Sequence, residues 1–362
     1  PHEKGNPMIG IRDLYRASDR TLARTPRPLR DAALRLVAPA TGLMSCPRVL
    51  MVEPTNACNG KCPLCPVGAR TMDRDVGMLD PGLLARVIDE VGPRVRMVIM
   101  NFAGEPFLHP RLPDLVRIAR GHGAQVLVGT NGTRDRASDI LDAEPTEILF
   151  SLDGTTPATY EQYRNYRDGT TLSDVKTNLE RLVDEKRRRS ASTRIVLQFV
   201  VFRHNESEID DVVDYAERVG VDAVDLKPAC VNDYFDEDVS ALKDRYLPTS
   251  SAIRQYRDDQ NGQAQLRPGF CSFAFNETQL AWNGDLISCC FDTDGANVLG
   301  NVERDGGLLQ VWNGDRGRSM QRKILRQGLD LCDQCGVTSV RSTRVDLRSK
   351  RPLPPTSAPP ST

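Results

Sequence analysis

The sequence predicts an α/β fold: a partial (β/α)6 TIM barrel followed by a small C-terminal domain of a β-hairpin and helices. Three observations lead to this prediction. From residue 47 to about 230, short apolar runs alternate with amphipathic helical patterns, which is typical of a parallel sheet covered by helices. Polar and glycine residues gather where the apolar runs end. Beyond 230 the alternation stops, and Asn283 and Gly284 give a hairpin signal between apolar residues.

Six strand–helix units account for the first part of the chain. Asp80 and Pro81 open one of the helices, because an aspartate caps a helix and a proline fits its first turn. The predicted strands are 49–53, 95–102, 124–130, 147–153, 194–202 and 223–227. The predicted helices are 81–91, 112–120, 134–142, 172–186 and 206–219.

Polar residues, glycines and cysteines that could form a functional site stand at the carboxyl ends of the predicted strands. Ordinary loop composition, which also favours Gly, Asn and Asp, explains any single one of these ends. Six polar ends, one of them bearing three cysteines, instead predict a functional site at this edge of the sheet. The ends read 53–56, 101–106, 129–132, 151–154, 198–205 and 227–230.

The first strand leads into a loop with three closely spaced cysteines, Cys58, Cys62 and Cys65. A four-iron, four-sulfur cube takes one ligand at each iron, so three thiolates leave one iron open to a small molecule. Zinc is the alternative, because it prefers four ligands in two pairs and Cys62 and Cys65 could pair with Cys332 and Cys335. The three-cysteine spacing favours the iron–sulfur interpretation.

Composition limits the class of protein. The chain has 362 residues and a net charge of −1, which indicates neither a nucleic-acid footprint nor attraction to an anionic membrane. No apolar run reaches membrane-spanning length and no signal peptide is evident, so a cytoplasmic location is expected. In that setting the ten cysteines are expected to be ligands or thiols rather than disulfides. Residues 1–7 are interpreted as an expression tag before Met8.

Five segments follow from these patterns. The barrel takes most of the chain, with short basic and amphipathic helices before it and an acidic, polar linker or lid after it. The basic, proline-rich C-terminus is expected to be disordered. The boundaries are 1–46 for the tag and helical extension, 47–230 for the barrel, 231–270 for the linker or lid, 271–343 for the auxiliary domain and 344–362 for the tail.

Over residues 47–230 the chain resembles the radical S-adenosylmethionine (radical SAM) enzymes. The three-cysteine loop matches the cluster motif of that family, and Ala103, Gly104 and Glu105 match its GGE motif with alanine in the first position. The resemblance implies a [4Fe–4S] cluster, SAM bound at its open iron, and contact of the Glu105 segment with the SAM amino group.

The resemblance also assigns the remaining SAM contacts. It places Leu64 over the adenine, where the family more often has an aromatic residue, and Arg164 on the SAM carboxylate. It implies further contacts with the ribose for Thr130 and Asn131, and with the methionine moiety for Ser151 and Asp153.

A second cysteine set follows the barrel. The arrangement of Cys271, a hairpin, Cys289, and then Cys332 and Cys335 resembles the twitch module, a shortened SPASM domain that holds one auxiliary [4Fe–4S] cluster. Four thiolates close every corner of that cluster, so electron transfer is its expected role. A structural zinc ribbon built from the same four cysteines is the alternative.

Three reactions compete for this assembly, which is expected to take electrons from a reductant such as flavodoxin or ferredoxin. The first is oxidation of a carbinol of a small polar substrate, a sugar or aminocyclitol of the antibiotic-biosynthesis type, to a ketone. Lys227 is then a candidate base and the auxiliary cluster accepts an electron. The second is epimerisation of such a substrate, with Cys230 as hydrogen-atom donor. The third, peptide maturation, ranks last because residues 9–45 are too short for a leader-peptide domain.

Overall fold

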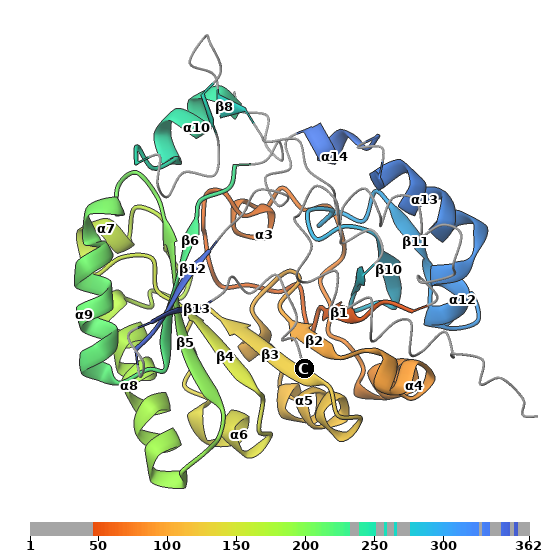
Figure 1. Ribbon diagram of the computed structural model, residues 1–362, viewed down its shortest axis with the longest axis horizontal. Helices are drawn as coiled ribbons and strands as arrows, with labels where there is room; N and C mark the ends of the chain where they lie inside the picture. The colour runs from red at the N-terminus through yellow and green to blue at the C-terminus, as the bar shows by residue number, and fades with distance from the viewer. Residues whose placement is uncertain are drawn as a thin grey trace, which may run out of the picture. The chain divides into compact units, whose positions relative to one another are not determined.

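The computed structural model describes residues 46–231, 239–250, 257–258, 264–265, 276–325, 328–333, 342–347 and 351–353 (Figure 1). Six parallel strands curl into a partial barrel, in the order in which they occur in the chain. They are β1 (Val49–Val52), β2 (Met97–Met100), β3 (Gln125–Thr130), β4 (Glu147–Ser151), β5 (Arg194–Val201) and β6 (Ala223–Pro228). The predicted (β/α)6 partial barrel is thereby confirmed.

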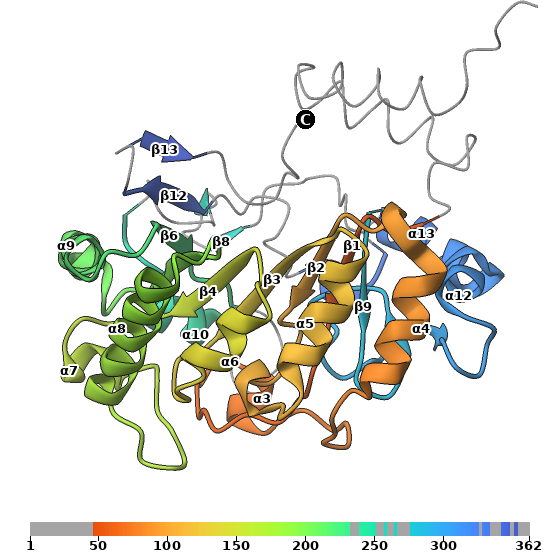
Figure 2. The ribbon, with the colours of Figure 1, turned by 90° about the horizontal axis from the view of Figure 1, so that it is seen from below.

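Helices cover the outside of this curled sheet, as Figure 2 shows. Local signals set their ends: the Asp80 side chain accepts a hydrogen bond from Leu83 N (3.0 Å), and Thr171 and Asp174 form a capping box. The helices are α4 (Pro81–Val91), α5 (Leu112–Gly121), α6 (Ala137–Asp142), α8 (Leu172–Arg189) and α9 (Ile209–Val219), with the short α3 (Pro66–Ala69) and α7 (Pro157–Tyr160) in loops.

The two faces of the barrel sheet are buried to different degrees. On the outer face, residues such as Leu50, Val98 and Ile148 are fully enclosed by the helices. On the inner face, their neighbours Met51 and Ile99 are only half-buried. This alternation follows from the strand period of two, and it leaves the inner face available to line a site.

The auxiliary part continues the same sheet beyond β1. β9 (Glu277–Leu280) pairs with β1, and β10 (Asp285–Ile287) and β11 (Val298–Asn301) follow in antiparallel pairing. The predicted hairpin at Asn283 and Gly284 is confirmed by the β9–β10 pair. The helices that follow are α12 (Leu308–Asn313), α13 (Asp315–Leu325) and α14 (Asp330–Asp333).

The predicted disordered tail from residue 344 is wrong for two segments. β12 (Thr343–Asp346) pairs antiparallel with β6, and β13 (Arg351–Leu353) pairs with β12. β12 forms because it covers the otherwise unpaired edge of β6 and because Arg344 reaches a buried carboxylate. The rest of the predicted tail lies outside the described residues.

The predicted linker or lid, 231–270, contains structure where it is described. α10 (Val239–Tyr246) packs against the ends of β5 and β6, and β7 (Arg257–Asp258) pairs with β8 (Ala264–Gln265). The predicted extension 1–46 lies outside the described residues except for Cys46. None of the described helices is long and apolar enough to cross a membrane.

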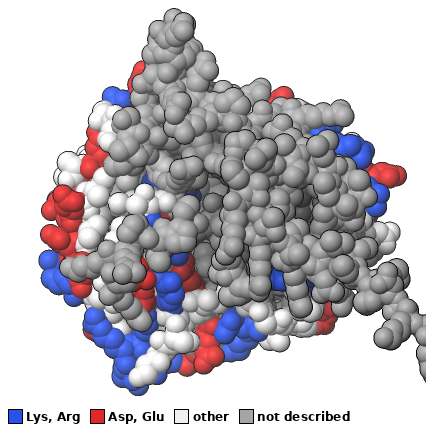
Figure 3. Space-filling view, in the orientation of Figure 1, with Lys and Arg blue, Asp and Glu red and all other residues white. Residues whose placement is uncertain are grey.

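Basic and acidic side chains are interspersed over the described part of the face in Figure 3, without a large area of one sign there. This distribution agrees with the net charge of −1.

Candidate active site

The three-cysteine loop leaves the carboxyl end of β1. Cys62 is buried, while Cys58 and Cys65 are half-buried. Gly60 lies between two of the thiols: its N–H donates to Cys58 Sγ (3.3 Å), and a methyl group on its Cα would lie 3.4 and 3.5 Å from the sulfurs of Cys58 and Cys62. The loop therefore bends around its own sulfur atoms.

A second segment, 163–168, clamps this loop from outside. Arg167 donates hydrogen bonds to the carbonyl oxygens of Cys58 (3.4 Å), Gly60 and Gly68 (2.7 Å). Asn59 in turn donates to Asp168 Oδ2 (2.8 Å). These protein contacts hold the conformation of the loop.

Gly104 and Glu105 lie against the chain that precedes Cys58. Glu105 N donates to Ala57 O (2.8 Å). Gly104 has a φ of +75°, and a Cβ at this position would lie 2.2 Å from Thr55 O. Only glycine fits such a conformation and such a close approach. The predicted SAM-binding segment at Gly104 and Glu105 therefore packs directly against the start of the cysteine loop.

The Glu105 carboxylate is buried and accepts three hydrogen bonds. The donors are Phe107 N (2.9 Å), the Thr130 hydroxyl (2.8 Å) and Asn131 N (2.6 Å). Burial raises the pKa of Glu105, whereas the donors favour its charged form. Its position ties the end of β3 to the segment after β2.

Asn131 also reaches the cluster loop directly. Its side-chain nitrogen donates to Asn59 Oδ1 (3.0 Å), and its oxygen accepts from Thr133 N (3.0 Å) and the Thr133 hydroxyl (2.8 Å). The amide is thus engaged at both ends within the protein. Thr130 and Asn131 thus support Glu105 and Asn59 beside the cysteine loop. Their contact with the ribose stays a prediction.

Arg164 lies between the cluster loop and the end of β4. Its Nε donates to Asp153 Oδ2 (2.6 Å), and its Nη1 lies 4.0 Å from Cys62 Sγ. Asp153 is fully buried and also accepts from Val200 N (2.7 Å). Burial opposes the charged guanidinium, but Asp153 and the nearby thiol raise the pKa of Arg164. A fixed cation therefore faces the cysteine loop.

Leu64 belongs to an apolar cluster on the same edge. It packs against residues from the end of β5, the end of β6 and α10. Tyr163 and Phe202 pack with tilted rings within this cluster, at 4.2 Å between ring centroids, and Tyr246 meets both rings edge-on. The predicted adenine contact therefore lies beside an aromatic surface supplied by other residues.

A row of polar side chains crosses the inner face of the barrel. Ser151, Gln198 and Asp225 are register neighbours on β4, β5 and β6. Gln198 Nε2 donates to Asp225 Oδ2 (3.4 Å). Lys227 follows on the same face of β6 and is exposed, whereas Cys230 is half-buried beyond the strand end. These residues share one side of the barrel mouth.

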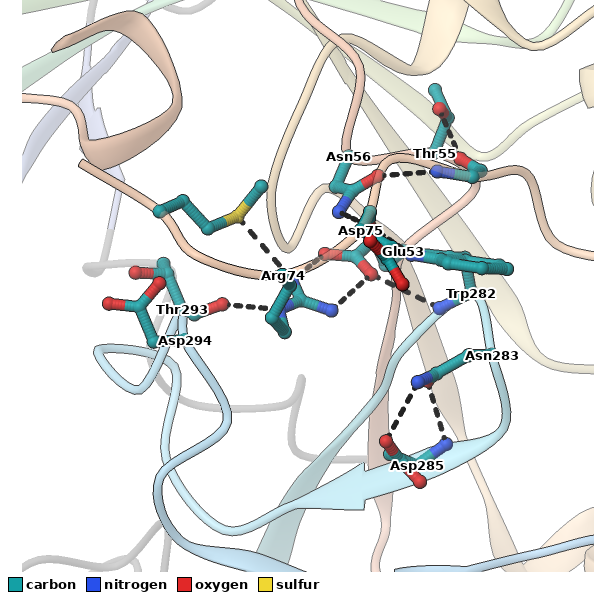
Figure 4. A network of polar contacts seen from close by, with 12 residues as sticks. Glu53, Thr55, Asn56, Arg74, Asp75, Trp282, Asn283, Asp285, Thr293 and Asp294 are labelled. Atoms are coloured by element: carbon teal, nitrogen blue, oxygen red, sulfur yellow. Dashed lines mark hydrogen bonds and ion pairs between the residues drawn. The ribbon is translucent and has the colours of Figure 1, made fainter. Parts of the chain in front are cut away.

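The Glu53 carboxylate, at the end of β1, joins the barrel to the auxiliary hairpin (Figure 4). It accepts two hydrogen bonds from Arg74, at 2.5 and 2.9 Å, and one from Trp282 N at 3.1 Å. Arg74 Nε donates to Thr293 O (2.5 Å). Trp282 Nε1 donates to Asp75 O (3.1 Å). The segment after the cysteine loop is therefore fastened to both parts.

Of the second cysteine set, Cys289 and Cys332 lie within the described residues, whereas Cys271 and Cys335 lie outside them. Cys289 and Cys290 follow β10, which ends at Ile287. The two thiols lie within hydrogen-bond reach of each other. Cys332 is half-buried in α14.

The first cysteine set fits an iron–sulfur cube. In the described part of the chain no disulfide joins these cysteines to others, and no three Cys, His, Asp or Glu side chains converge on a single ion position. A cube binds each thiolate at a different iron, so its ligands surround it. Burial raises the pKa of Cys58 to about 12 and of Cys62 to about 11, so metal binding must displace both protons.

Sequence patterns alone did not predict that residues 163–168 hold the cysteine loop, or that Glu53 joins the barrel to the auxiliary hairpin. Asn59, Arg167 and Asp168 carry no motif of their own, although Arg167 and Asp168 stand close after Arg164. The Glu53–Arg74 pair had one signal, a carboxylate directly after an apolar strand. Its partner is 21 residues further on, so only the fold identifies it.

Comparisons with known proteins agree with this geometry. Residues 52–216 match the radical SAM superfamily, and residues 271–336 match SPASM, an iron–sulfur cluster-binding domain. The chain is 25% identical over 328 residues to the mycofactocin maturase MftC of Mycobacterium ulcerans, covering 85% of each chain. It is 26% identical over 279 residues to the PqqA peptide cyclase of Streptomyces rochei, covering 69% of this chain and 70% of the cyclase.

Among solved structures, the chain resembles SuiB of Streptococcus suis bound to S-adenosylmethionine. The TM-score is 0.56 at 13% sequence identity, and the match covers 91% of this chain and 83% of SuiB. At this identity the likeness concerns the fold. The radical SAM domain implies a [4Fe–4S] cluster and SAM, and the SPASM domain implies auxiliary iron–sulfur ligation.

Proposed function

Because this chain carries a radical SAM domain followed by a SPASM domain, we propose that it is a radical SAM oxidoreductase that oxidises a carbinol of a small polar substrate to a ketone. Cys58, Cys62 and Cys65 would hold the first [4Fe–4S] cluster. The auxiliary cluster would be held by Cys271, Cys289, Cys332 and Cys335. When bound, the first cluster and SAM supply a 5′-deoxyadenosyl radical that removes a hydrogen atom from an unactivated carbon.

The residues around the loop would bind and orient SAM. Arg164 supports this proposal most directly, since it is a half-buried cation that Asp153 fixes beside Cys62. It would bind the SAM carboxylate, with Gly104 and Glu105 at the amino group. Leu64 and its aromatic neighbours would exclude water from the adenine. Thr130 and Asn131 would lie near the ribose of SAM, and Ser151 near its methionine moiety.

The polar side chains on the inner face of the barrel support the proposed class of substrate. Ser151, Gln198 and Asp225 offer hydrogen-bond donors and acceptors across three strands, and Lys227 follows at the mouth. A hydroxyl-bearing sugar or aminocyclitol matches this lining. In the proposed oxidation the substrate would give one hydrogen atom to the deoxyadenosyl radical, one proton to Lys227 and one electron to the auxiliary cluster, which balances the loss of two hydrogens.

The experiment is anaerobic reconstitution followed by turnover with SAM, a reductant and a panel of sugars and aminocyclitols. We expect deoxyadenosine to form together with a product that is two hydrogens lighter. The Lys227→Met variant should form product more slowly while its affinity for SAM changes less. Unchanged mass with solvent deuterium would instead establish epimerisation, and Cys230→Ala would then divert the radical. Colourless protein containing zinc without iron or sulfide would overturn the radical SAM assignment.

A second function, modification of a peptide, is favoured by the names of the relatives. MftC is named a maturase and the Streptomyces rochei relative a PqqA peptide cyclase, and both are about a quarter identical to this chain. The same turnover assay therefore includes precursor peptides encoded beside the gene. Deoxyadenosine formed only with such a peptide, and a change in peptide mass, would replace the small-molecule proposal.

A further inference from the structure

A surface hollow of about 490 Å³ lies beside the cysteine loop and is lined by Lys61, Gly68, Ala69, Arg70 and Arg167. Every charged residue in this lining is basic. Lys61 and Arg70 are exposed, and Arg167 is half-buried. We call this feature the basic hollow.

The wall of the basic hollow is the cysteine loop itself. Lys61 is bonded to Cys62 through one peptide group, and a Cβ on Gly68 would lie 2.5 Å from Cys62 O. Arg167 contacts the carbonyl oxygens of Cys58 and Gly60 from the same side. A molecule seated in the hollow is therefore separated from the cluster ligands by the thickness of one loop.

Among the residues that the structure describes, no acidic side chain pairs with the exposed cations of the hollow. Most basic side chains near the site are paired, as Arg164 is with Asp153 and Arg74 is with Glu53. Within the described ranges, neither Lys61 nor Arg70 takes part in an ion pair. The basic hollow is thus a local positive field on a chain whose net charge is −1.

The geometry favours a large acidic partner over a small anion. The Nη atoms of Arg167 are engaged by three backbone carbonyls, so that guanidinium cannot grip a phosphate with both ends. Lys61 and Arg70 are two exposed, flexible cations nine positions apart in the sequence. Such an arrangement suits steering of a protein surface, which needs complementary charge more than fixed chelation.

We propose that the basic hollow docks an acidic one-electron carrier protein of the flavodoxin or ferredoxin class. The inference rests on the proposed function, because radical SAM chemistry consumes an electron at the cluster held by Cys58, Cys62 and Cys65. In the step, the reduced carrier loses one electron and the cluster gains it, and no bond or proton is exchanged. Transient electron-transfer complexes have small, wet interfaces, which the open hollow can supply.

The test is the double variant Lys61→Glu/Arg70→Glu in the reconstituted protein. Stopped-flow absorbance follows reduction of the cluster by reduced flavodoxin, and separately by dithionite. We expect the rate with flavodoxin to fall by about tenfold or more at low salt and to lose its dependence on ionic strength. The rate with dithionite should stay within about twofold of the wild type, because a small reductant needs no docking surface.

The matched control is Arg96→Glu/Arg117→Glu, which changes the net charge equally. Arg96 precedes the amino end of β2 and Arg117 lies on the exposed side of α5, both away from the cysteine loop. This control should leave both rates unchanged. An equal fall in the control, or an equal fall with both reductants, would overturn docking at the basic hollow.

The readout separates this inference from the proposed function. Cluster reduction needs no substrate and no product, so it is measured even if no carbinol is oxidised. If flavodoxin reduces the wild-type cluster but not that of Lys61→Glu/Arg70→Glu, docking stands whatever the reaction is. Should flavodoxin reduce both proteins equally while deoxyadenosine forms normally, docking fails and the proposed chemistry survives.

Discussion

The carboxylate of Glu53 accepts hydrogen bonds from both terminal nitrogens of Arg74, at 2.5 and 2.9 Å, at a position that is fully buried at the end of β1. The same carboxylate accepts from Trp282 N in the auxiliary hairpin. One ion pair thus connects the strand that leads into the cysteine loop, the segment that leaves it, and the SPASM domain. It adds to the backbone pairing of β9 with β1, which also joins that strand to the SPASM domain.

Arg74→Met should therefore destabilise the protein strongly. It leaves the Glu53 charge buried without a partner, and removing one side of a buried pair costs about 3–5 kcal/mol. Anaerobic urea denaturation measures the loss. Arg111→Met is the matched control, because its pair with Asp114 is exposed on both sides and should contribute less than about 1 kcal/mol. Equal losses in the two variants would contradict the buried-pair interpretation.

Asp153→Asn should weaken SAM binding while leaving the cluster in place. Asp153 fixes Arg164 through a 2.6 Å hydrogen bond, so its loss frees the guanidinium from the cysteine loop. Positioning partners of this kind typically account for about a 10- to 100-fold change in affinity or activity. SAM affinity is measured by equilibrium dialysis, and iron and sulfide by chemical assay.

Arg164→Lys distinguishes geometry from charge at the same site. Lysine keeps the positive charge but lacks the planar fork that binds a carboxylate with two hydrogen bonds. We expect SAM affinity to fall in this variant by at least as much as in Asp153→Asn. Wild-type affinity in Arg164→Lys would show that Arg164 does not bind the SAM carboxylate.

His109 should make folding stability depend on pH. It is buried, its Nε2 lies 3.0 Å from Leu79 O, and its Nδ1 accepts from Arg111 N at 3.1 Å. Burial lowers the pKa of His109. The unfolded chain therefore binds a proton near pH 6.5 while the native state stays neutral, so the stability contribution is present above that pH and is lost as pH falls toward the folded value.

The measurement is urea denaturation of the wild type and His109→Gln between about pH 5 and pH 8. The wild type should lose up to about 1.4 kcal/mol per pH unit below pH 6.5 from this group. His109→Gln should be less stable at neutral pH and show a shallower slope. Identical slopes would assign the pH dependence to other groups.

The barrel could be predicted from the sequence because its signals are local and repeated. Apolar strand bodies, helix caps such as Asp80 and the alternation of strand and helix place the six βα units, most ends falling within a few residues of those observed. The cysteine spacing likewise predicted a cluster-binding loop after β1; the structure has a loop there, and its ligand role stays a prediction. Motifs carry such information because the same residues must contact the same cofactor.

The supporting contacts could not be predicted because they join residues far apart in the chain. Arg167 donates hydrogen bonds to the carbonyl oxygens of Gly60 and Gly68. Every residue has a backbone carbonyl, so the sequence does not show which ones accept such bonds. Arg344 lies in a basic, proline-rich segment whose composition indicates disorder, yet its partner Glu147 lies 197 positions earlier. Composition cannot reveal a single buried acceptor that orders such a segment.

The Arg344–Glu147 pair allows this explanation of β12 to be tested. Arg344 donates two hydrogen bonds to Glu147, both at 3.0 Å, and both side chains are 7% exposed. Its Nε also lies 3.9 Å from Asp225 Oδ1 on the neighbouring strand. If this pair holds β12 against β6, removing it should release the strand from the edge of the barrel.

Arg344→Met should destabilise the protein by about 3–5 kcal/mol and expose the β12 amides to hydrogen exchange, because it leaves Glu147 and Asp225 as buried charges without a cation. The double variant Arg344→Met/Glu147→Gln should recover part of that loss, since the uncompensated charge at Glu147 is removed. Deuterium uptake at 343–346 is followed by mass spectrometry in all three proteins. Unchanged uptake in Arg344→Met would show that backbone pairing with β6 holds the strand without the ion pair.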